Sequence, residues 1–381
     1  MLSDEQSGGR PTWAEIDLAA LADNFGAVRA RVGAGVQIMC VVKADAYGHG
    51  AVACARRLAA AGADWFAVAL PEEGIELRAA GVSQPILCLE GFWTGQAEAC
   101  LRDRLVPMLY RLDMAEALDC AARTAGTIAE AHVKIDTGMG RLGVRYDEAA
   151  EFAGALRAYP NLRVVGLMTH FASADDAEQD CFTSEQIKRF NAAVNTFRAC
   201  GHELELTDMA NSAATFAHPA ARGNMVRPGG VLYGLWRDVL QPGGELPELR
   251  PVMALRSRIT LLKFVLPGET LGYGCTFEAT RRTRVATLPV GYHDGYPRAL
   301  SNRGRVIVRA QYAPVVGRVS MDTTLVDVTD VYGVELGDIV TLLGADGDLS
   351  VPAEDLAQTA DTISYEITCG VSARVPRRYT G

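Results

Sequence analysis

Eight short apolar segments separated by amphipathic stretches lie between residues 37 and 230, and this alternation restricts the possible folds more than any other feature. The segments are rich in β-branched residues and are typical of buried strands, whereas most of the stretches between them have the period of helices. The predicted strands are Gln37–Lys43, Trp65–Leu70, Pro85–Glu90, Val106–Tyr110, His132–Asp136, Val164–His170, Glu203–Asn211 and Asn224–Gly230. The predicted helices are Ala51–Ala63, Glu72–Ala80, Met114–Thr124, Asp147–Ala158 and Ser184–Cys200. Eight such units over roughly 200 residues predict an α/β fold, a parallel (β/α)8 TIM barrel, with a doubly wound open sheet as the alternative.

From about Pro251 the helical period fades and strand-like runs follow one another, bounded by Gly, Pro and Asp. This pattern predicts a mainly antiparallel β C-terminal domain. Its predicted strands are Leu255–Phe264, Arg284–Pro289, Val306–Gln311, Thr323–Val328 and Asp338–Leu343. We therefore divide the chain into a flexible segment over 1–12, a barrel over 13–248 and a β-rich domain over 249–381. An extra strand at 13–18 precedes the barrel and is free to pair with the C-terminal domain.

The charge and cysteine content argue against several classes of protein. The net charge is −9 with no long basic run, which disfavours binding to nucleic acid or to an anionic membrane. No apolar stretch reaches the roughly 18 residues of a membrane span, and residues 1–11 lack the pattern of a signal peptide. The nine cysteines form no CxxC pair and have no ligand spacing with the six histidines, so we expect no metal site. An odd number of cysteines without a secretory signal predicts a reducing, cytoplasmic location.

Lys43 ends the first predicted strand, so in a barrel its side chain would lie at the mouth, where the active sites of this fold are found. Partial burial there would lower its pKa and leave a neutral amine that can form a Schiff base, whereas a solvated surface lysine is the simpler alternative. Polar residues also end or follow later strands: Asp136, Thr137, Arg141, His170, Asn211, Ser212 and Arg227. Each alone could be a helix cap, a core histidine or a surface ion pair, but their coincidence on one rim favours a functional site.

The residue types at this rim suit one kind of cofactor. Ser212 at a helix start, together with the backbone of Gly229 and Gly230, offers donors to a phosphate, and glycine lets the anion approach closely. Arg141 and Arg227 are permanent cations that suit an oxyanion or an aromatic acceptor. A lysine able to form a Schiff base beside a phosphate site is what a pyridoxal phosphate enzyme requires.

At these positions, and along essentially its whole length, the chain resembles the alanine racemase family. The motifs that carry the resemblance are 42–50 (VKADAYGHG), 134–141 (KIDTGMGR), 169–172 (THFA), 225–229 (MVRPG), 273–274 (YG), 291–295 (GYHDG), 317–322 (GRVSMD) and 363–366 (ISYE). The resemblance implies an enzyme that interconverts L-alanine and D-alanine with pyridoxal 5′-phosphate and supplies D-alanine for peptidoglycan. A serine or broad-spectrum racemase on the same scaffold is the alternative.

The resemblance also implies roles for individual residues. Lys43 holds the cofactor and is one catalytic base; Tyr273 is the other and comes from the partner subunit of a homodimer. Arg227 faces the pyridine nitrogen and keeps it unprotonated, which disfavours transamination, and His170 links Arg227 to the partner's Tyr273. Arg141 contacts the cofactor's phenolic oxygen and the substrate carboxylate, and Lys134 matches a position that is carbamylated in some relatives. The residues that bind the phosphate are Tyr47, Ser212, Gly229, Gly230 and Tyr365. Met321 supplies a backbone donor to the substrate carboxylate. The substrate entrance is lined by Asp175, Tyr292, Arg298 and Arg318.

Three other interpretations compete with this one. The run Gly138–Gly143 satisfies the dinucleotide fingerprint GxGxxG, but the next helix is predicted to begin only near Asp147, and no acidic residue ends the following strand. A non-catalytic pyridoxal phosphate carrier would lack the β-rich domain, which is present here. A decarboxylase of this fold type would place an acid, not Arg227, at the pyridine nitrogen. Two departures from the family pattern stand out, Pro228-Gly229-Gly230 and His293, and we have no account of the second.

Overall fold

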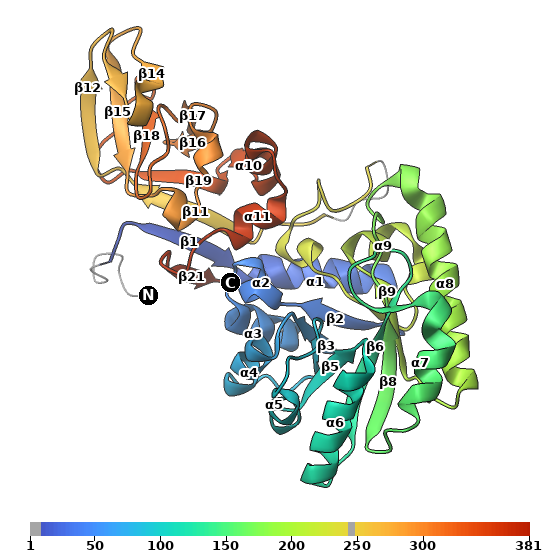
Figure 1. The fold of residues 1–381 in the computed structure, drawn as a ribbon. Helices are drawn as coiled ribbons and strands as arrows, with labels where there is room; N and C mark the ends of the chain where they lie inside the picture. The colour runs from blue at the N-terminus through green and yellow to red at the C-terminus, as the bar shows by residue number, and fades with distance from the viewer. Residues whose placement is uncertain (1–8, 243–247) are drawn as a thin grey trace. The chain divides into compact units, whose positions relative to one another are not determined.

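The computed structural model describes residues 9–242 and 248–381 and divides into two compact units (Figure 1). One unit comprises residues 21–250, and the other combines the chain up to residue 20 with residues 251–381. Residues 1–8 of the predicted flexible segment lie outside the described residues. Arg10, within the same segment, is anchored: its guanidinium donates to the carboxylate of Asp294 and, over 2.6 Å, to the carbonyl of Pro289.

The first unit is a closed barrel of eight parallel strands, so the predicted fold is confirmed and the open sheet is wrong. The hydrogen-bonded order runs β5-β4-β3-β2-β10-β9-β8-β6, and β5 also pairs with β6, which closes the ring. All eight predicted strands are present, most of them slightly shorter than predicted. Their bounds are β2 (Gln37–Val41), β3 (Trp65–Val68), β4 (Ile86–Cys88), β5 (Leu105–Leu109), β6 (Ala129–Asp136), β8 (Leu162–Met168), β9 (Leu206–Ala210) and β10 (Met225–Val226), with the short β7 (Val144–Arg145) beside β6.

Helices connect the strands, and the five predicted ones are present as α3 (Ala51–Ala61), α4 (Pro71–Ala79), α6 (Leu112–Ala125), α7 (Ala149–Leu156) and α8 (Asp180–Ala199). The short helix expected to open at Ser212 is α9 (Ser212–Ala217). Three further helices were not predicted, α1 (Leu18–Val32), the short α2 (Lys43–Tyr47) and α5 (Ala97–Arg102). α1 has a recognisable start, because the carboxylate of Asp17 accepts a hydrogen bond from the backbone N–H of Ala20, the usual N-cap interaction.

The inside of the barrel is mostly apolar. Because successive side chains of a strand point to opposite faces, alternate residues of each strand fill this interior. The largest set comprises Met39, Val41, Ala67, Leu87, Leu89, Val106, Met108, Met168, Leu206 and Met225. Lys134 and Asp208 pair in register with Met168 on the two neighbouring strands, so they share its face and bring charge into the barrel. Both are buried, as is Arg227, which directly follows β10.

Besides the antiparallel pair β13–β14, the second unit contains two larger, mainly antiparallel sheets. The larger has the order β17-β16-β19-β11-β1-β21, with β20 paired to β19, and the smaller has the order β12-β15-β18. The bounds are β1 (Thr12–Asp17), β11 (Met253–Arg258), β12 (Leu261–Val265), β13 (Thr270–Leu271), β14 (Phe277–Glu278), β15 (Thr283–Leu288), β16 (Arg305–Val308), β17 (Gln311–Pro314), β18 (Thr324–Asp327), β19 (Ile339–Asp346), β20 (Leu349–Val351) and β21 (Arg377–Thr380).

Three details of this unit differ from the sequence prediction. The extra strand, β1, pairs with β11 and β21, so these residues group with residues 251–381 rather than with the predicted 13–248 barrel. The single strand predicted over Leu255–Phe264 is two strands, because β11 pairs with β19 whereas β12 pairs with β15 in the other sheet. Two helices were not predicted, α10 (Ala353–Ala360) and α11 (Ser364–Cys369). Throughout residues 9–242 and 248–381, every helix is too short or too polar to cross a bilayer.

Candidate functional site

Lys43 opens a turn with an unusual backbone. It begins α2 (Lys43–Tyr47), in which Ala44, Asp45, Ala46 and Tyr47 all have φ between 53° and 55°, the left-handed helical region. Each non-glycine residue in that region costs about 1–2 kcal/mol, and a run of four is rare. Such strain persists only where surrounding contacts impose it, and it is concentrated at functional sites.

Several hydrogen bonds hold this left-handed turn in place. The carboxylate of Asp45 accepts from the N–H of Ala51 at 2.7 Å, and the carboxylate of Glu73 accepts from the N–H of Ala44 at 2.7 Å. The side chain of Ala46 is fully buried. These contacts come from α3 and α4, so the helices that follow the first two barrel strands fix the backbone beside Lys43.

The amine of Lys43 lies in an environment that favours its neutral form. The side chain is half-buried at the carboxyl end of β2, and burial, followed by the cation Arg141, lowers its pKa. A lowered pKa leaves more of the amine unprotonated and nucleophilic at neutral pH. The alternative interpretation, a solvated surface lysine, does not fit this environment.

Tyr47, Ser212 and Gly229 lie close together. The N–H of Gly229 donates to the hydroxyl of Ser212 at 2.9 Å, and a Cβ added to Gly229 would lie 2.5 Å from the Tyr47 hydroxyl oxygen. Glycine at 229 therefore lets the Tyr47 hydroxyl lie against the backbone, which a larger residue would not. Gly230 follows at the start of a short 3-10 helix, and the N–H of Val41 donates to the carbonyl of Pro228 at 3.0 Å, which ties this loop to β2. The Ser212 hydroxyl and the Gly229-Gly230 backbone lie beside the Tyr47 hydroxyl, and these are the kinds of group that bind a phosphate, so the residues fit the phosphate of pyridoxal phosphate.

Arg227 lies beside His170 and is not the surface ion pair considered as its alternative, because only 3% of it is exposed. One of its terminal nitrogens donates to the carbonyl of Thr169 at 2.9 Å and lies 3.4 Å from Nδ1 of His170. Burial and the charge of Arg227 hold the pKa of His170 well below its usual value. His170 is therefore a neutral ring, with Nδ1 available to accept a hydrogen bond from the guanidinium.

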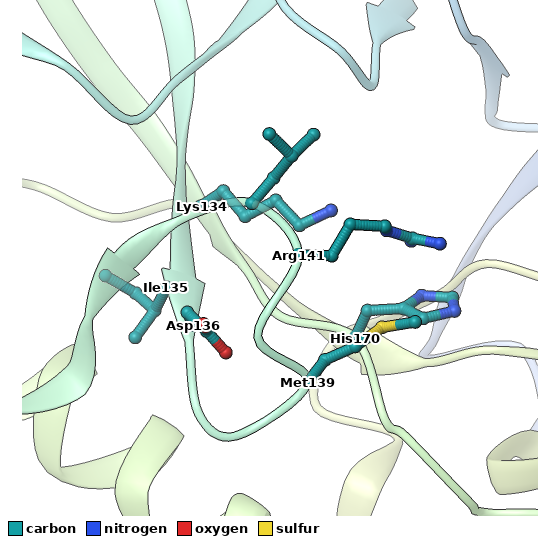
Figure 2. Close-up of a pocket in the computed structure, with 7 residues that line it drawn as sticks. Lys134, Ile135, Asp136, Met139, Arg141 and His170 are labelled. Atoms are coloured by element: carbon teal, nitrogen blue, oxygen red, sulfur yellow. The ribbon is translucent and has the colours of Figure 1, made fainter.

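A pocket of about 180 Å³, part of it open to solvent, lies at the end of β6. Figure 2 shows the side chains of Lys134 and Arg141 extending in the same direction beside the ring of His170, whereas Asp136 points elsewhere. The carboxylate of Asp136 accepts from the N–H groups of Gly138 and Gly140, at 2.9 and 3.1 Å, and so shapes the loop that carries Arg141. The lining residues are Lys134, Ile135, Asp136, Met139, Arg141, Leu142 and His170.

Only 5% of Lys134 is exposed. Burial, with added repulsion from Arg227 and Arg141, lowers its pKa to about 8. A cation is therefore disfavoured at this position, and a group of negative charge would be stabilised by the two arginines.

The remaining predicted residues, apart from Asp175, belong to the C-terminal unit. Tyr273 opens a short turn and is 72% exposed, and a Cβ added to Gly274 would lie 3.1 Å from the guanidinium of Arg318, so Arg318 lies against this turn. Arg298 is exposed on a short 3-10 helix. Asp175 is exposed in the barrel unit. The predicted site residues are thus divided between the two units.

A buried carboxylate closes the turn that carries Tyr292. Asp294 is fully buried and accepts hydrogen bonds from Arg10, from Arg374 at 2.7 Å and from the N–H of Gly291 at 2.8 Å. The turn that it closes is bound to the Met321 segment, because the N–H groups of residues 292 and 293 donate to the carbonyls of residues 320 and 321, both at 3.0 Å. His293 contributes its backbone N–H here while its side chain is exposed, so this contact does not require histidine at the position that departs from the family motif.

The end of α11, the helix that carries Tyr365, packs against the same turn. A Cβ added to Gly295 would lie 2.2 Å from the carbonyl of Gly370, which immediately follows α11. Three segments that supply predicted site residues, those of Tyr292, Met321 and Tyr365, therefore lie side by side.

Two charged residues important to this arrangement were not selected from the sequence. Arg10 lies ahead of the first strand, where the composition predicted only flexibility. Asp208 lies inside β9 and is fully buried, with its Oδ2 3.1 Å from Nε of Arg227. The available signal for Asp208 was a charged residue two positions after Leu206, on the same face of a predicted strand.

The chain matches two family models in tandem. Residues 16–236 match the alanine racemase N-terminal domain, and residues 252–379 match the alanine racemase C-terminal domain. An alanine racemase of Geobacter sulfurreducens is 48% identical over 376 residues, and one of Halothermothrix orenii is 45% identical over 373 residues; each comparison covers 97% of both chains. The solved structure of alanine racemase from D-cycloserine-producing Streptomyces lavendulae superposes with a TM-score of 0.92 at 36% identity, covering 98% of both chains. This chain belongs to the alanine racemase family.

Proposed function

We propose that this protein is a pyridoxal-phosphate-dependent racemase that interconverts L-alanine and D-alanine. The observation that carries the proposal is that the lysine anchor and the predicted phosphate site share one segment. Lys43 and Tyr47 are the first and last residues of one strained turn, and Tyr47 lies against Gly229. A covalent anchor and a phosphate cradle held by one rigid segment suit a cofactor that is bound at both positions. Family membership and the curated relatives support the same assignment.

Pyridoxal phosphate, when bound, supplies a carbonyl for the lysine amine and an electron sink that acidifies the Cα proton of an amino acid. The chain's own residues supply the rest. Tyr47, Ser212, Gly229, Gly230 and Tyr365 bind the phosphate, and Arg227 donates toward the ring nitrogen without releasing its proton. Arg141 and the backbone N–H of Met321 bind the substrate carboxylate, and Asp175, Tyr292, Arg298 and Arg318 line the entrance.

Racemisation requires proton transfer on both faces of Cα. Lys43 holds or receives the proton on one face, and Tyr273 of the partner subunit does so on the other, which makes a homodimer part of the proposal. The lysine serves the D-enantiomer and the tyrosine the L-enantiomer. The exposed position of Tyr273 in a single chain is consistent with a residue that acts in a neighbouring subunit.

Lys134 is a candidate for carbamylation. Its pKa of about 8 leaves part of the amine neutral near pH 7, and the neutral amine is the form that reacts with CO2. The carbamate would carry negative charge toward Arg141, whose guanidinium it would orient. The D-alanine formed would serve peptidoglycan synthesis in the cytoplasm.

Chiral chromatography of the purified protein supplied with pyridoxal phosphate tests the proposal. L-alanine should be converted to D-alanine rapidly and L-serine slowly, and a Lys43→Ala variant should lose both the conversion and the borohydride-reducible cofactor linkage. Comparable turnover of several amino acids would replace the alanine assignment with the broad-spectrum alternative. A wild-type protein that binds the cofactor but racemises nothing would overturn the proposal in favour of a carrier.

A further inference from the structure

Asp208 is a buried carboxylate that none of the proposed roles uses. Its side chain is fully buried on the interior face of β9, between Met168 of β8 and Met225 of β10. Among the described residues, no donor forms a hydrogen bond with either of its oxygens. Removing an ion from water costs several kcal/mol, so an ionised carboxylate in this position needs a compensating charge.

Arg227 is the nearest compensating charge. Its Nε lies 3.1 Å from Oδ2 of Asp208, while the Nε hydrogen points to the sulfur of Met168 at 3.2 Å. The terminal nitrogens are on the other side of the guanidinium, where one of them donates to Thr169 and faces His170. The guanidinium is therefore held between an anion inside the barrel and a neutral ring at the rim.

We propose that Asp208 is a positioning residue that fixes the orientation of Arg227 and balances its charge, so that the arginine presents a paired rather than an isolated cation to the cofactor ring. This inference rests on the proposed function, in which Arg227 faces the pyridine nitrogen. Asp208 acts through Arg227 and does not itself touch the cofactor or the substrate in this scheme.

Burial and the charged groups around Asp208 determine the pH range in which its carboxylate is ionised. The groups whose charge reaches it are Arg227, directly after β10, and Lys134 on β6, both cations, whereas Met168 on β8 is uncharged. Burial raises the pKa of Asp208 to about 6 despite these cations. The counter-charge is therefore present at neutral pH and is lost as the pH falls through about 6.

The test is a pH titration of the absorption spectrum of the cofactor-loaded enzyme without substrate. Wild type should show a spectral change near pH 6, because protonation of Asp208 leaves Arg227 unbalanced beside the ring. Asp208→Asn should lack this change and resemble the acid form of wild type at every pH. Leu206→Val, two residues earlier on the same face of β9, alters packing but no charge and should retain the change. Asp208→Glu should still show a spectral change with pH, so this variant tests the inference if the asparagine variant does not fold.

A second measurement follows the side reaction that Arg227 is expected to suppress. In that reaction the amino group of alanine remains on the cofactor as pyridoxamine phosphate and pyruvate is released. Asp208→Asn should form about tenfold more pyridoxamine phosphate per racemisation turnover, a change of about 1.4 kcal/mol in the partition between the two outcomes. Leu206→Val should not.

An identical pH 6 transition in wild type and in Asp208→Asn, with an unchanged ratio of side product, would overturn the inference and leave Asp208 a purely structural residue. Failure of the proposed function is a different result, because wild type itself would then bind no cofactor or racemise no alanine.

Discussion

The left-handed turn after Lys43 predicts that a residue normally considered destabilising will stabilise this protein. Ala44 is exposed, with φ of 53° and ψ of 50°, so the substitution Ala44→Gly removes its Cβ without opening a cavity. The left-handed penalty that it relieves is about 1–2 kcal/mol. The added freedom of glycine in the unfolded chain offsets about 0.5–1 kcal/mol of this gain. The net expectation is a stabilisation of about 0.5–1 kcal/mol.

The matched control is Ala117→Gly, which is the same substitution at another exposed alanine, within α6. In an ordinary right-handed helix it should destabilise by about 1 kcal/mol. At about 2–4 °C per kcal/mol for a unit of this size, the two variants should differ in Tm by several degrees and with opposite signs relative to wild type. Both are compared by thermal and urea unfolding at one protein and one cofactor concentration, because binding and assembly also shift the midpoint. Equal destabilisation by the two substitutions would refute the assignment of strain to the turn.

Three further predictions concern the site. Gly229→Ala should weaken pyridoxal phosphate binding at least about tenfold in an equilibrium titration, since its Cβ would lie 2.5 Å from the Tyr47 hydroxyl. The control Gly26→Ala has open space around the new Cβ and should bind the cofactor as wild type does. Tyr273→Phe should suppress exchange of the Cα hydrogen of L-alanine far more than that of D-alanine in deuterated water, and equal losses would contradict the two-base scheme. Burial alone would raise the pKa of Asp294, but hydrogen bonds from Arg10 and Arg374 lower it overall. The stability that the ionised Asp294 contributes is therefore present at neutral pH and is lost as the pH falls below about 4. In calorimetry, Asp294→Asn should unfold at a lower temperature than wild type at pH 7 and should lack this part of the acid dependence.

The barrel was predictable from the sequence because each of its strands is a short apolar run separated from the next by a helix or a loop. The same reasoning failed over Leu255–Phe264, where one continuous strand-like run changes sheets after Arg258, and nothing local marks the change. The left-handed conformation at Ala44–Tyr47 was not predictable from the sequence either, because alanine and aspartate also occur in ordinary right-handed helices. It is imposed by tertiary contacts, such as that from Glu73 to the N–H of Ala44, which a single sequence does not reveal.

The rim residues of the barrel were predictable for a geometric reason, since the carboxyl ends of all its parallel strands meet at one rim, where polar residues that end or follow the strands come close together. Asp294 and its partner Arg10 were not, because they meet only after the chain has folded back over more than 280 residues. Asp208 was missed for a different reason, because it lies within a predicted strand, whereas the site residues were selected at or after the strand ends.

Four cations, Lys43, Lys134, Arg141 and Arg227, act on one another at the carboxyl end of the barrel. Burial, followed by repulsion from the arginines, which cannot release their protons, lowers the pKa of both lysines. This is the condition that a covalent anchor requires, because the neutral amine is the reactive form. The anions of the proposed reaction, a phosphate and a substrate carboxylate, would be drawn to this excess positive charge. The buried carboxylate of Asp208 limits that excess from inside the barrel, so that Arg227 remains fixed and charged while Lys43 is free to change its protonation state.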